Sequence, residues 1–127
     1  MTDNSQNNVV FEKSKCFALR IIKLYKFLGE EKAEYVISKQ ILRCGTSIGA
    51  NIAESVYAQS RSDFVGKLSI SLKEAAETGY WLDILYKSNY INKSSYDSVR
   101  KDCDELMKIL TSIVRTTKNS AKQQNCN

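Results

Sequence analysis

Histidine is absent from this chain of 127 residues, and its absence excludes several kinds of chemistry. Histidine is the side chain that most often transfers protons at neutral pH, so Ser–His and Cys–His nucleophile pairs cannot form. Di-iron bundles that bind metal through Glu-x-x-His motifs are excluded for the same reason. The sequence also contains no P-loop and no G-x-G-x-x-G loop to bind phosphate. We therefore expect a protein that is not an enzyme and that binds neither a cofactor nor a metal ion.

Proline is absent too, and glycine occurs only five times, so long helices meet few interruptions. No apolar run approaches the roughly 20 residues of a membrane-spanning helix, and the polar N-terminus does not resemble a signal peptide. The cysteines are far apart and form no C-x-x-C motif; they are Cys16, Cys44, Cys103 and Cys126. This spacing favours reduced thiols over a disulfide framework or a zinc site. We expect a cytoplasmic protein with no membrane partner.

One stretch, Cys44–Ser55, conflicts with helix propensity and yet keeps a helical period. Two glycines within a helix cost about 1 kcal/mol each relative to alanine. The apolar residues nevertheless fall on one stripe at helical spacing, namely Ile37, Ile41, Ile48, Ile52 and Val56. Beside them Gly45, Gly49 and Ala53 form a flat flank that a neighbouring helix could approach closely. We predict a helix held by tertiary packing, although a Gly/Ser-rich loop is the alternative.

The remaining hydrophobic pattern predicts four helices, over residues 11–28, 33–57, 61–88 and 94–117. Gly29 is expected to end the first helix. Ser60 with Asp63 resembles a capping box at the start of the third. We expect a disordered lead over residues 1–10, a single bundle domain over 11–118, and a disordered tail over 119–127. Short connections favour an all-α, up-down-up-down antiparallel four-helix bundle.

Several apolar residues lie outside the stripes that would form the core of such a bundle. The first predicted helix contains Leu19 and Phe27. The third contains Ile70, Trp81 and Ile84, interleaved with Glu74 and Glu77. A tryptophan with two isoleucines on one outer face indicates a subunit interface, and self-association is the commonest way to cover it. The alternative is a wide bundle whose core these residues flank.

Lysine and arginine number 19 against 14 acidic residues, which gives a net charge of +5 and suits binding to a polyanion. The candidate nucleic-acid-binding residues lie on the outer faces of the first and fourth predicted helices: Lys13, Arg20, Lys23, Lys26, Lys108, Arg115, Lys118 and Lys122. A solvated basic face is the alternative. Because no aromatic-plus-basic motif is present, binding would depend on phosphates and be sensitive to salt.

Two sequence motifs resemble those of a known family. They are Thr46–Glu54, TSIGANIAE, and residues 63–82, DFxxKLxIxLxEAxETxxWL. They are similar to the small bacterial four-helix proteins encoded within intervening sequences of large-subunit ribosomal RNA genes. That family is also labelled as ribosomal proteins and includes the accessory variability determinant (Avd) proteins of diversity-generating retroelements. The resemblance covers residues 11–115, and Ser55 departs from it where glycine is expected.

This resemblance implies an up-down bundle that forms a ring-shaped homopentamer. In the retroelement branch it also implies a basic surface that contacts nucleic acid and a reverse transcriptase partner. The matched polar and aromatic residues are implied to be architectural, with none catalytic; they are Ser47, Asn51, Glu54, Glu74, Glu77 and Trp81.

Two functional hypotheses follow from the sequence. The first is a non-enzymatic oligomer that binds structured RNA or another nucleic acid through its basic outer faces. The second is a protein-interaction scaffold with no nucleic-acid role, which docks a partner through the face that contains Trp81.

Overall fold

The computed structural model describes residues 4–126, with side chains described for residues 5–120. Within that part the chain consists of helices, with no strand. The four helices are α1 (Asn4–Lys32), α2 (Ile37–Ser55), α3 (Arg61–Lys87) and α4 (Lys93–Cys126). The prediction of an all-α protein with four helices is therefore confirmed.

The first and last helices extend beyond their predicted bounds, over most of the predicted lead and tail. Helix α1 begins at Asn4, because Val10 is already in the core and is only 1% exposed. Helix α4 continues to Cys126 instead of ending at 117. Thr117 is still fully buried there, and no glycine follows Gly79 to interrupt the helix. Residues 1–3 and 127 lie outside the described part.

The two helix–helix turns at one end of the molecule do not use glycine. Helix α1 runs past the predicted stop at Gly29 to Lys32, and Ala33 then takes a left-handed conformation with φ 52°. Asn89 does the same after α3, with φ 67°, so that the Tyr90 N–H reaches the carbonyl of Leu85 at 2.9 Å. An asparagine in this conformation is common at helix ends. An alanine there is not signalled by sequence.

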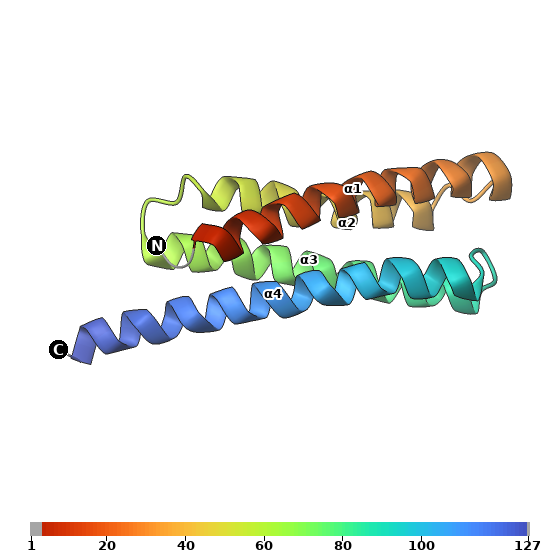
Figure 1. Ribbon diagram of the computed structural model, residues 1–127. Coiled ribbons are helices and arrows are strands. Elements are labelled where there is room, and N and C mark those ends of the chain that lie inside the picture. The colour runs from red at the N-terminus through yellow and green to blue at the C-terminus, as the bar shows by residue number, and fades with distance from the viewer. Residues whose placement is uncertain (1–3, 127) are drawn as a thin grey trace.

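Each helix packs antiparallel to its neighbours, as Figure 1 shows. Helix α1 contacts α2 and α4, and α3 contacts the same two helices. Along α1, Lys13 pairs with Glu105 at 3.0 Å and Arg20 pairs with Asp102 at 2.6 Å, so α4 runs in the opposite direction. The α1–α2 and α3–α4 turns lie at one end of the molecule, and the α2–α3 connection lies at the other.

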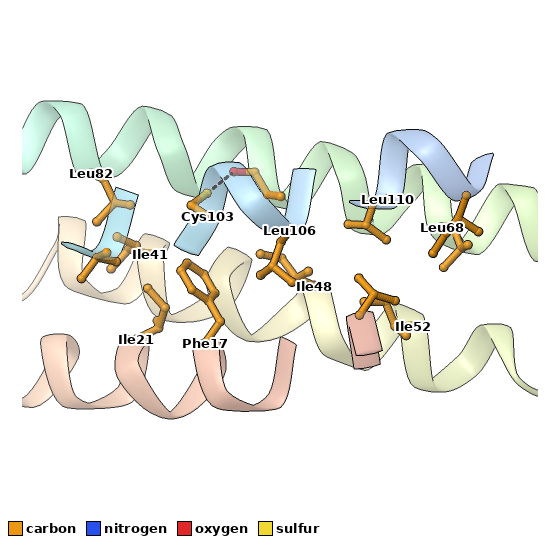
Figure 2. Packing of buried hydrophobic residues seen from close by; sticks show 14 of the residues in the cluster. Phe17, Ile21, Ile41, Ile48, Ile52, Leu68, Leu82, Cys103, Leu106 and Leu110 are labelled. Atoms are coloured by element: carbon orange, nitrogen blue, oxygen red, sulfur yellow. Dashed lines mark hydrogen bonds between the residues drawn. The ribbon is translucent and has the colours of Figure 1, made fainter. Parts of the chain in front are cut away.

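The core lies between the four helices and consists largely of the predicted stripes (Figure 2). Its largest fully buried side chains come from every helix and include Phe17, Ile21, Ile41, Ile48, Leu68, Leu82, Leu106 and Leu110. Val56 is an exception, since α2 ends before it and leaves it 69% exposed. Buried Cys103 donates its S–H to the Ala75 carbonyl at 3.2 Å, and burial raises its pKa to about 12, so this thiol stays protonated.

The glycine-containing stretch of α2 is helical, as predicted, and the reason is close packing against α1. Gly45 and Gly49 are both buried. A Cβ atom on Gly45 would lie 2.8 Å from Cγ1 of Ile21, and one on Gly49 would lie 3.0 Å from Oγ of Ser14. The missing side chains therefore let α1 approach α2, and buried contacts offset the low helix propensity.

Helix α3 has the predicted N-terminal cap, whereas α2 is capped by a side chain that the sequence did not indicate. Ser60 accepts from the Asp63 N–H at 3.0 Å. Glu34, only 7% exposed, accepts from the N–H groups of Val36, Ile37 and Ser38 at 2.7–3.1 Å. Burial raises the pKa of Glu34, but these hydrogen bonds outweigh it and hold the pKa below its ordinary value of 4.5.

Glu34→Gln is therefore expected to lower the free energy of unfolding by about 1.5 kcal/mol near pH 7, since charge-assisted hydrogen bonds are replaced by weaker ones. The pKa is lower in the folded state than in the unfolded one, so the stabilisation is complete above 4.5. It is lost as the pH falls through the folded-state pKa. Urea unfolding at neutral and at acidic pH measures this. The difference between wild type and variant should shrink in acid, and the exposed Glu31→Gln should show no such change.

Candidate functional site

Two of the candidate nucleic-acid-binding residues are occupied within the bundle. Lys13 pairs with Glu105 on α4, and Arg20 pairs with Asp102. Arg20 also donates to the Ser98 hydroxyl at 2.8 Å and to the Ser98 carbonyl at 3.3 Å. These contacts neutralise the middle of the face that α1 and α4 share. Ion pairs between α1 and α4 therefore account for the presence of Lys13 and Arg20.

The other candidate cations are exposed and form no ion pair with any described residue; they are Lys23, Lys26, Lys108, Arg115 and Lys118. The side chain of Lys122 lies outside the described residues. Because Arg20 lies opposite Asp102, the first two are near the α3–α4 turn, whereas Arg115 and Lys118 are toward the other end. Twenty residues of α4 between these levels span about 30 Å. The predicted basic face is thus divided into two patches, one on α1 with Lys23 and Lys26 and one along α4 with Lys108, Arg115 and Lys118.

The candidate interface residues also divide into two groups. Helices α1 and α3 are not neighbours around the core within the described part of the chain. Leu19 and Phe27, which are 62% and 39% exposed, therefore do not adjoin the candidate residues of α3. On α3, by contrast, Ile70 is 42% exposed, while Trp81 and Ile84 are half-buried. A single contiguous interface can include the α3 residues without those of α1.

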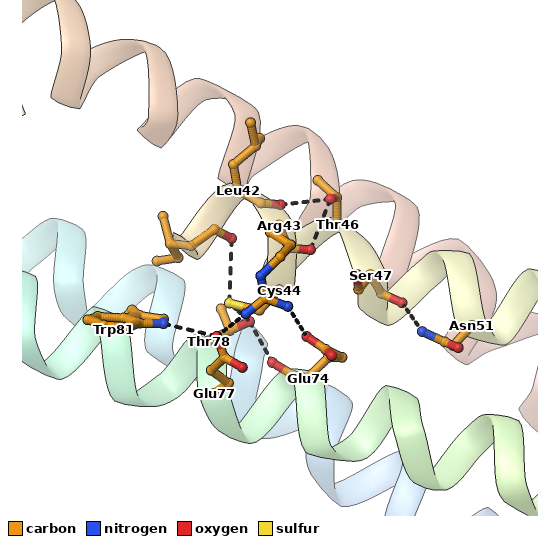
Figure 3. A network of polar contacts seen from close by, with 11 residues as sticks. Leu42, Arg43, Cys44, Thr46, Ser47, Asn51, Glu74, Glu77, Thr78 and Trp81 are labelled. Atoms are coloured by element: carbon orange, nitrogen blue, oxygen red, sulfur yellow. Dashed lines mark hydrogen bonds and ion pairs between the residues drawn. The ribbon is translucent and has the colours of Figure 1, made fainter. Parts of the chain in front are cut away.

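A polar network joins α2 to this part of α3 (Figure 3). Arg43 contacts the Glu74 carboxylate at 3.3 Å and forms an ion pair with Glu77. Glu77 also accepts from the Trp81 indole N–H at 3.1 Å, which fixes the orientation of the ring. Arg43 was not predicted from the sequence, because an exposed arginine on α2 does not indicate which residues of α3 it contacts.

The residues implied to be architectural gather along α2 and α3 in the same region. Glu54 pairs with Lys67 at 3.4 Å. The Asn51 side chain donates to the Ser47 carbonyl at 2.9 Å, which gives this mid-helix asparagine an internal partner. These contacts lie within one chain, so they position the surface of the bundle and leave its apolar residues facing outward.

An exposed aromatic residue beside Trp81 was also not predicted from the sequence. Tyr80 is 56% exposed and packs edge to face against Trp81, with ring centroids 4.9 Å apart. Tyr80 follows Ile70 by ten residues, which is about 80° around the helix, so the helical period alone did not place it with Ile70. We call Ile70, Glu77, Tyr80, Trp81 and Ile84 the outer α3 surface.

None of the helices in the described residues is long and apolar enough to cross a membrane. In the same residues, no group of His, Cys, Asp or Glu side chains could hold a metal ion. The chain is therefore defined as an all-α four-helix bundle with two exposed basic patches and a partly apolar outer α3 surface.

Comparison with known proteins places this bundle in a family. The family model described as 23S rRNA-intervening sequence protein matches residues 6–112. The chain belongs to that family, which confirms the resemblance found in the two sequence motifs.

A similar solved structure supports the same assignment. It is a crystal structure of a protein of unknown function from the S23 ribosomal protein family of Bacteroides thetaiotaomicron VPI-5482. The two chains are 55% identical and have a TM-score of 0.86, and the match covers 87% of this chain and 98% of the other. A search of curated proteins gave no match.

Proposed function

We propose that this chain is a non-enzymatic, homo-oligomeric bundle that binds structured RNA through the exposed cations of α1 and α4. The observation on which the proposal depends is the set of basic side chains that form no ion pair with described residues, including Lys23, Lys26, Arg115 and Lys118. Solvated cations can contact phosphates without first breaking an internal ion pair. The family name refers to 23S rRNA, and the similar solved protein is assigned to a ribosomal protein family.

Assembly belongs to the same proposal. We infer an up-down-up-down bundle that forms a closed ring of copies, a pentamer by family resemblance, with the outer α3 surface between subunits. A ring multiplies a weak site by the number of subunits, so a modest charge on each chain can give useful affinity. In the retroelement branch of the family a reverse transcriptase would be a further partner. A reverse transcriptase gene with template repeats beside this gene would support that branch.

The RNA-binding proposal predicts a strong dependence on salt. Anisotropy of a fluorescein-labelled RNA hairpin should show tight binding at about 50 mM salt that weakens steeply toward about 200 mM. Arg115→Gln combined with Lys118→Gln should weaken binding about tenfold and reduce the salt slope by about 2, since each lost phosphate contact removes about one unit. An absence of binding at the lower salt, or a flat salt response, would contradict the proposal.

A charge-matched variant separates position from net charge. Lys73→Gln combined with Lys87→Gln removes two exposed lysines of α3 and gives the same net charge as the α4 variant. This control should keep nearly wild-type affinity if the α4 patch binds RNA. Equal losses in both variants would mean that only the overall charge matters.

The second candidate function is a scaffold that docks a different protein through the outer α3 surface. The exposed side chains of Ile70 and Tyr80 favour it, because exposed apolar groups on one surface often mark a protein–protein interface. Light scattering of the purified chain distinguishes the two. A stable homo-oligomer supports self-assembly, whereas a monomer that does not bind RNA supports the scaffold.

A further inference from the structure

A groove of about 490 Å³ lies between the C-terminal part of α1 and the N-terminal part of α4. We call it the α1/α4 groove, and five of the residues that line it are Arg20, Lys23, Phe27, Asn92 and Ser95. Its volume is within the range of about 300–1,000 Å³ that is typical of sites for small ligands. This places aromatic, basic and polar groups together, although the sequence contains no motif that combines them.

We propose that the α1/α4 groove binds one unstacked nucleotide of a single-stranded RNA segment, with the base against Phe27 and the phosphate near Lys23. The inference rests on the proposed RNA-binding function and names the place where a base is held. It adds stacking to a mode of binding that the charge pattern alone would limit to phosphates.

Phe27 provides the surface for stacking. Its ring is 39% exposed, and the aliphatic side chains of Leu24 and Ile91 line the same groove. The Lys32 Nζ atom lies over the Phe27 ring, 5.9 Å from its centroid, and adds positive charge there. Proteins that bind single-stranded RNA commonly stack bases on aromatic rings next to cations.

The charges that line the groove suit a phosphate. Lys23 is exposed and has no ion pair among the described residues, while Arg20 is held in place by Asp102 and Ser98. No acidic side chain is among the described residues that line the groove. A second groove, between α1 and α2, contains Glu30 in its lining, which would repel a phosphate.

Polar groups at the α4 edge could recognise a base. The Asn92 Oδ1 atom accepts from the Ser95 N–H at 2.8 Å and so caps the start of α4. The Asn92 amide N–H₂ group and the Ser95 hydroxyl have no hydrogen-bond partner within the described part of the structure. Both are exposed, and both suit the edge of a base that is no longer paired.

An apolar side chain from another protein or from a second copy could also fill such a groove. The lining favours a polyanion, because Lys23 has no ion-pair partner among the described residues and would stay unpaired against an apolar partner, whereas Arg20 already pairs with Asp102. The test must therefore separate RNA binding from assembly.

The experiment uses the full chain and a short single-stranded RNA that contains 2-aminopurine, whose fluorescence reports stacking. Wild type should change the fluorescence on binding. Phe27→Leu, which keeps the apolar bulk but not the ring, should abolish this change and weaken affinity about tenfold. Lys23→Gln should reduce the salt slope by about 1, whereas Lys73→Gln on α3 should leave fluorescence and affinity unchanged.

Three outcomes would overturn the inference. If wild type binds RNA with a salt dependence but Phe27→Leu leaves both the fluorescence change and the affinity unchanged, the groove is not the site and the proposed function stands. If Phe27→Leu instead alters the oligomeric state by light scattering, the groove is a protein interface. Failure of wild type to bind any RNA would remove the proposed function together with the inference.

Discussion

Gly45→Ala is expected to lower the free energy of unfolding by about 2 kcal/mol, although alanine is the better helix former. The added Cβ would lie 2.8 and 2.9 Å from the two γ carbons of Ile21, a side chain that is fully buried. Neither helix can move apart without opening the core. Thermal unfolding followed by circular dichroism should show a decrease in Tm of about 8 °C.

The control is the same substitution where space exists. Gly29 is also helical, and a Cβ atom there would meet Tyr35 Cε1 at 3.6 Å, an ordinary van der Waals distance. Gly29→Ala should therefore raise stability by up to about 1 kcal/mol through helix propensity alone. If Gly45→Ala were equally stabilising, close packing would not be the reason for the glycine in α2.

The existence of the helices was predictable because burial repeats along the sequence at a helical period. Ile41, Ile48 and Ile52 mark the inward side of α2 even though the residues between them disfavour a helix. The ends of the helices were less predictable. Ala33 takes a left-handed conformation directly after α1, and the Glu34 side chain caps α2. Neither residue type is a typical signal for that role. Tertiary packing decides such ends.

The candidate sites were only partly predictable, because the sequence gives the charge of each residue but not its partner. Lys13 and Lys23 have the same character in the sequence, yet only Lys13 meets an acid from α4. Phe27 and Ile70 were both predicted to be interface residues, but the sequence does not show that their helices, α1 and α3, are not neighbours within the described residues. Which side chains share a surface depends on the order of the helices around the core.

Ile70→Glu is expected to abolish the proposed assembly. Ile70 is 42% exposed on the outer α3 surface, beside the network that holds Trp81. A carboxylate in the centre of a closed subunit interface would be buried without a partner in every copy. Light scattering should therefore change from an oligomer to a monomer. The affinity for an RNA hairpin should fall about 100-fold, since the gain from multiple sites would be lost.

Leu19→Glu is the matched control, because Leu19 is more exposed than Ile70 but belongs to α1. The same charge placed there should leave the oligomer intact if the outer α3 surface of one subunit meets a face other than α1 in the next. Loss of assembly in both variants would mean that α3 of one subunit packs on α1 of its neighbour, as a ring interface allows. Retention of assembly by Ile70→Glu and its loss in Leu19→Glu would move the interface to α1. If Ile70→Glu becomes monomeric and still binds RNA as tightly as wild type, then RNA binding does not need the ring. The basic patches would in that case have to act within a single chain, so the size and the affinity must be measured on the same sample.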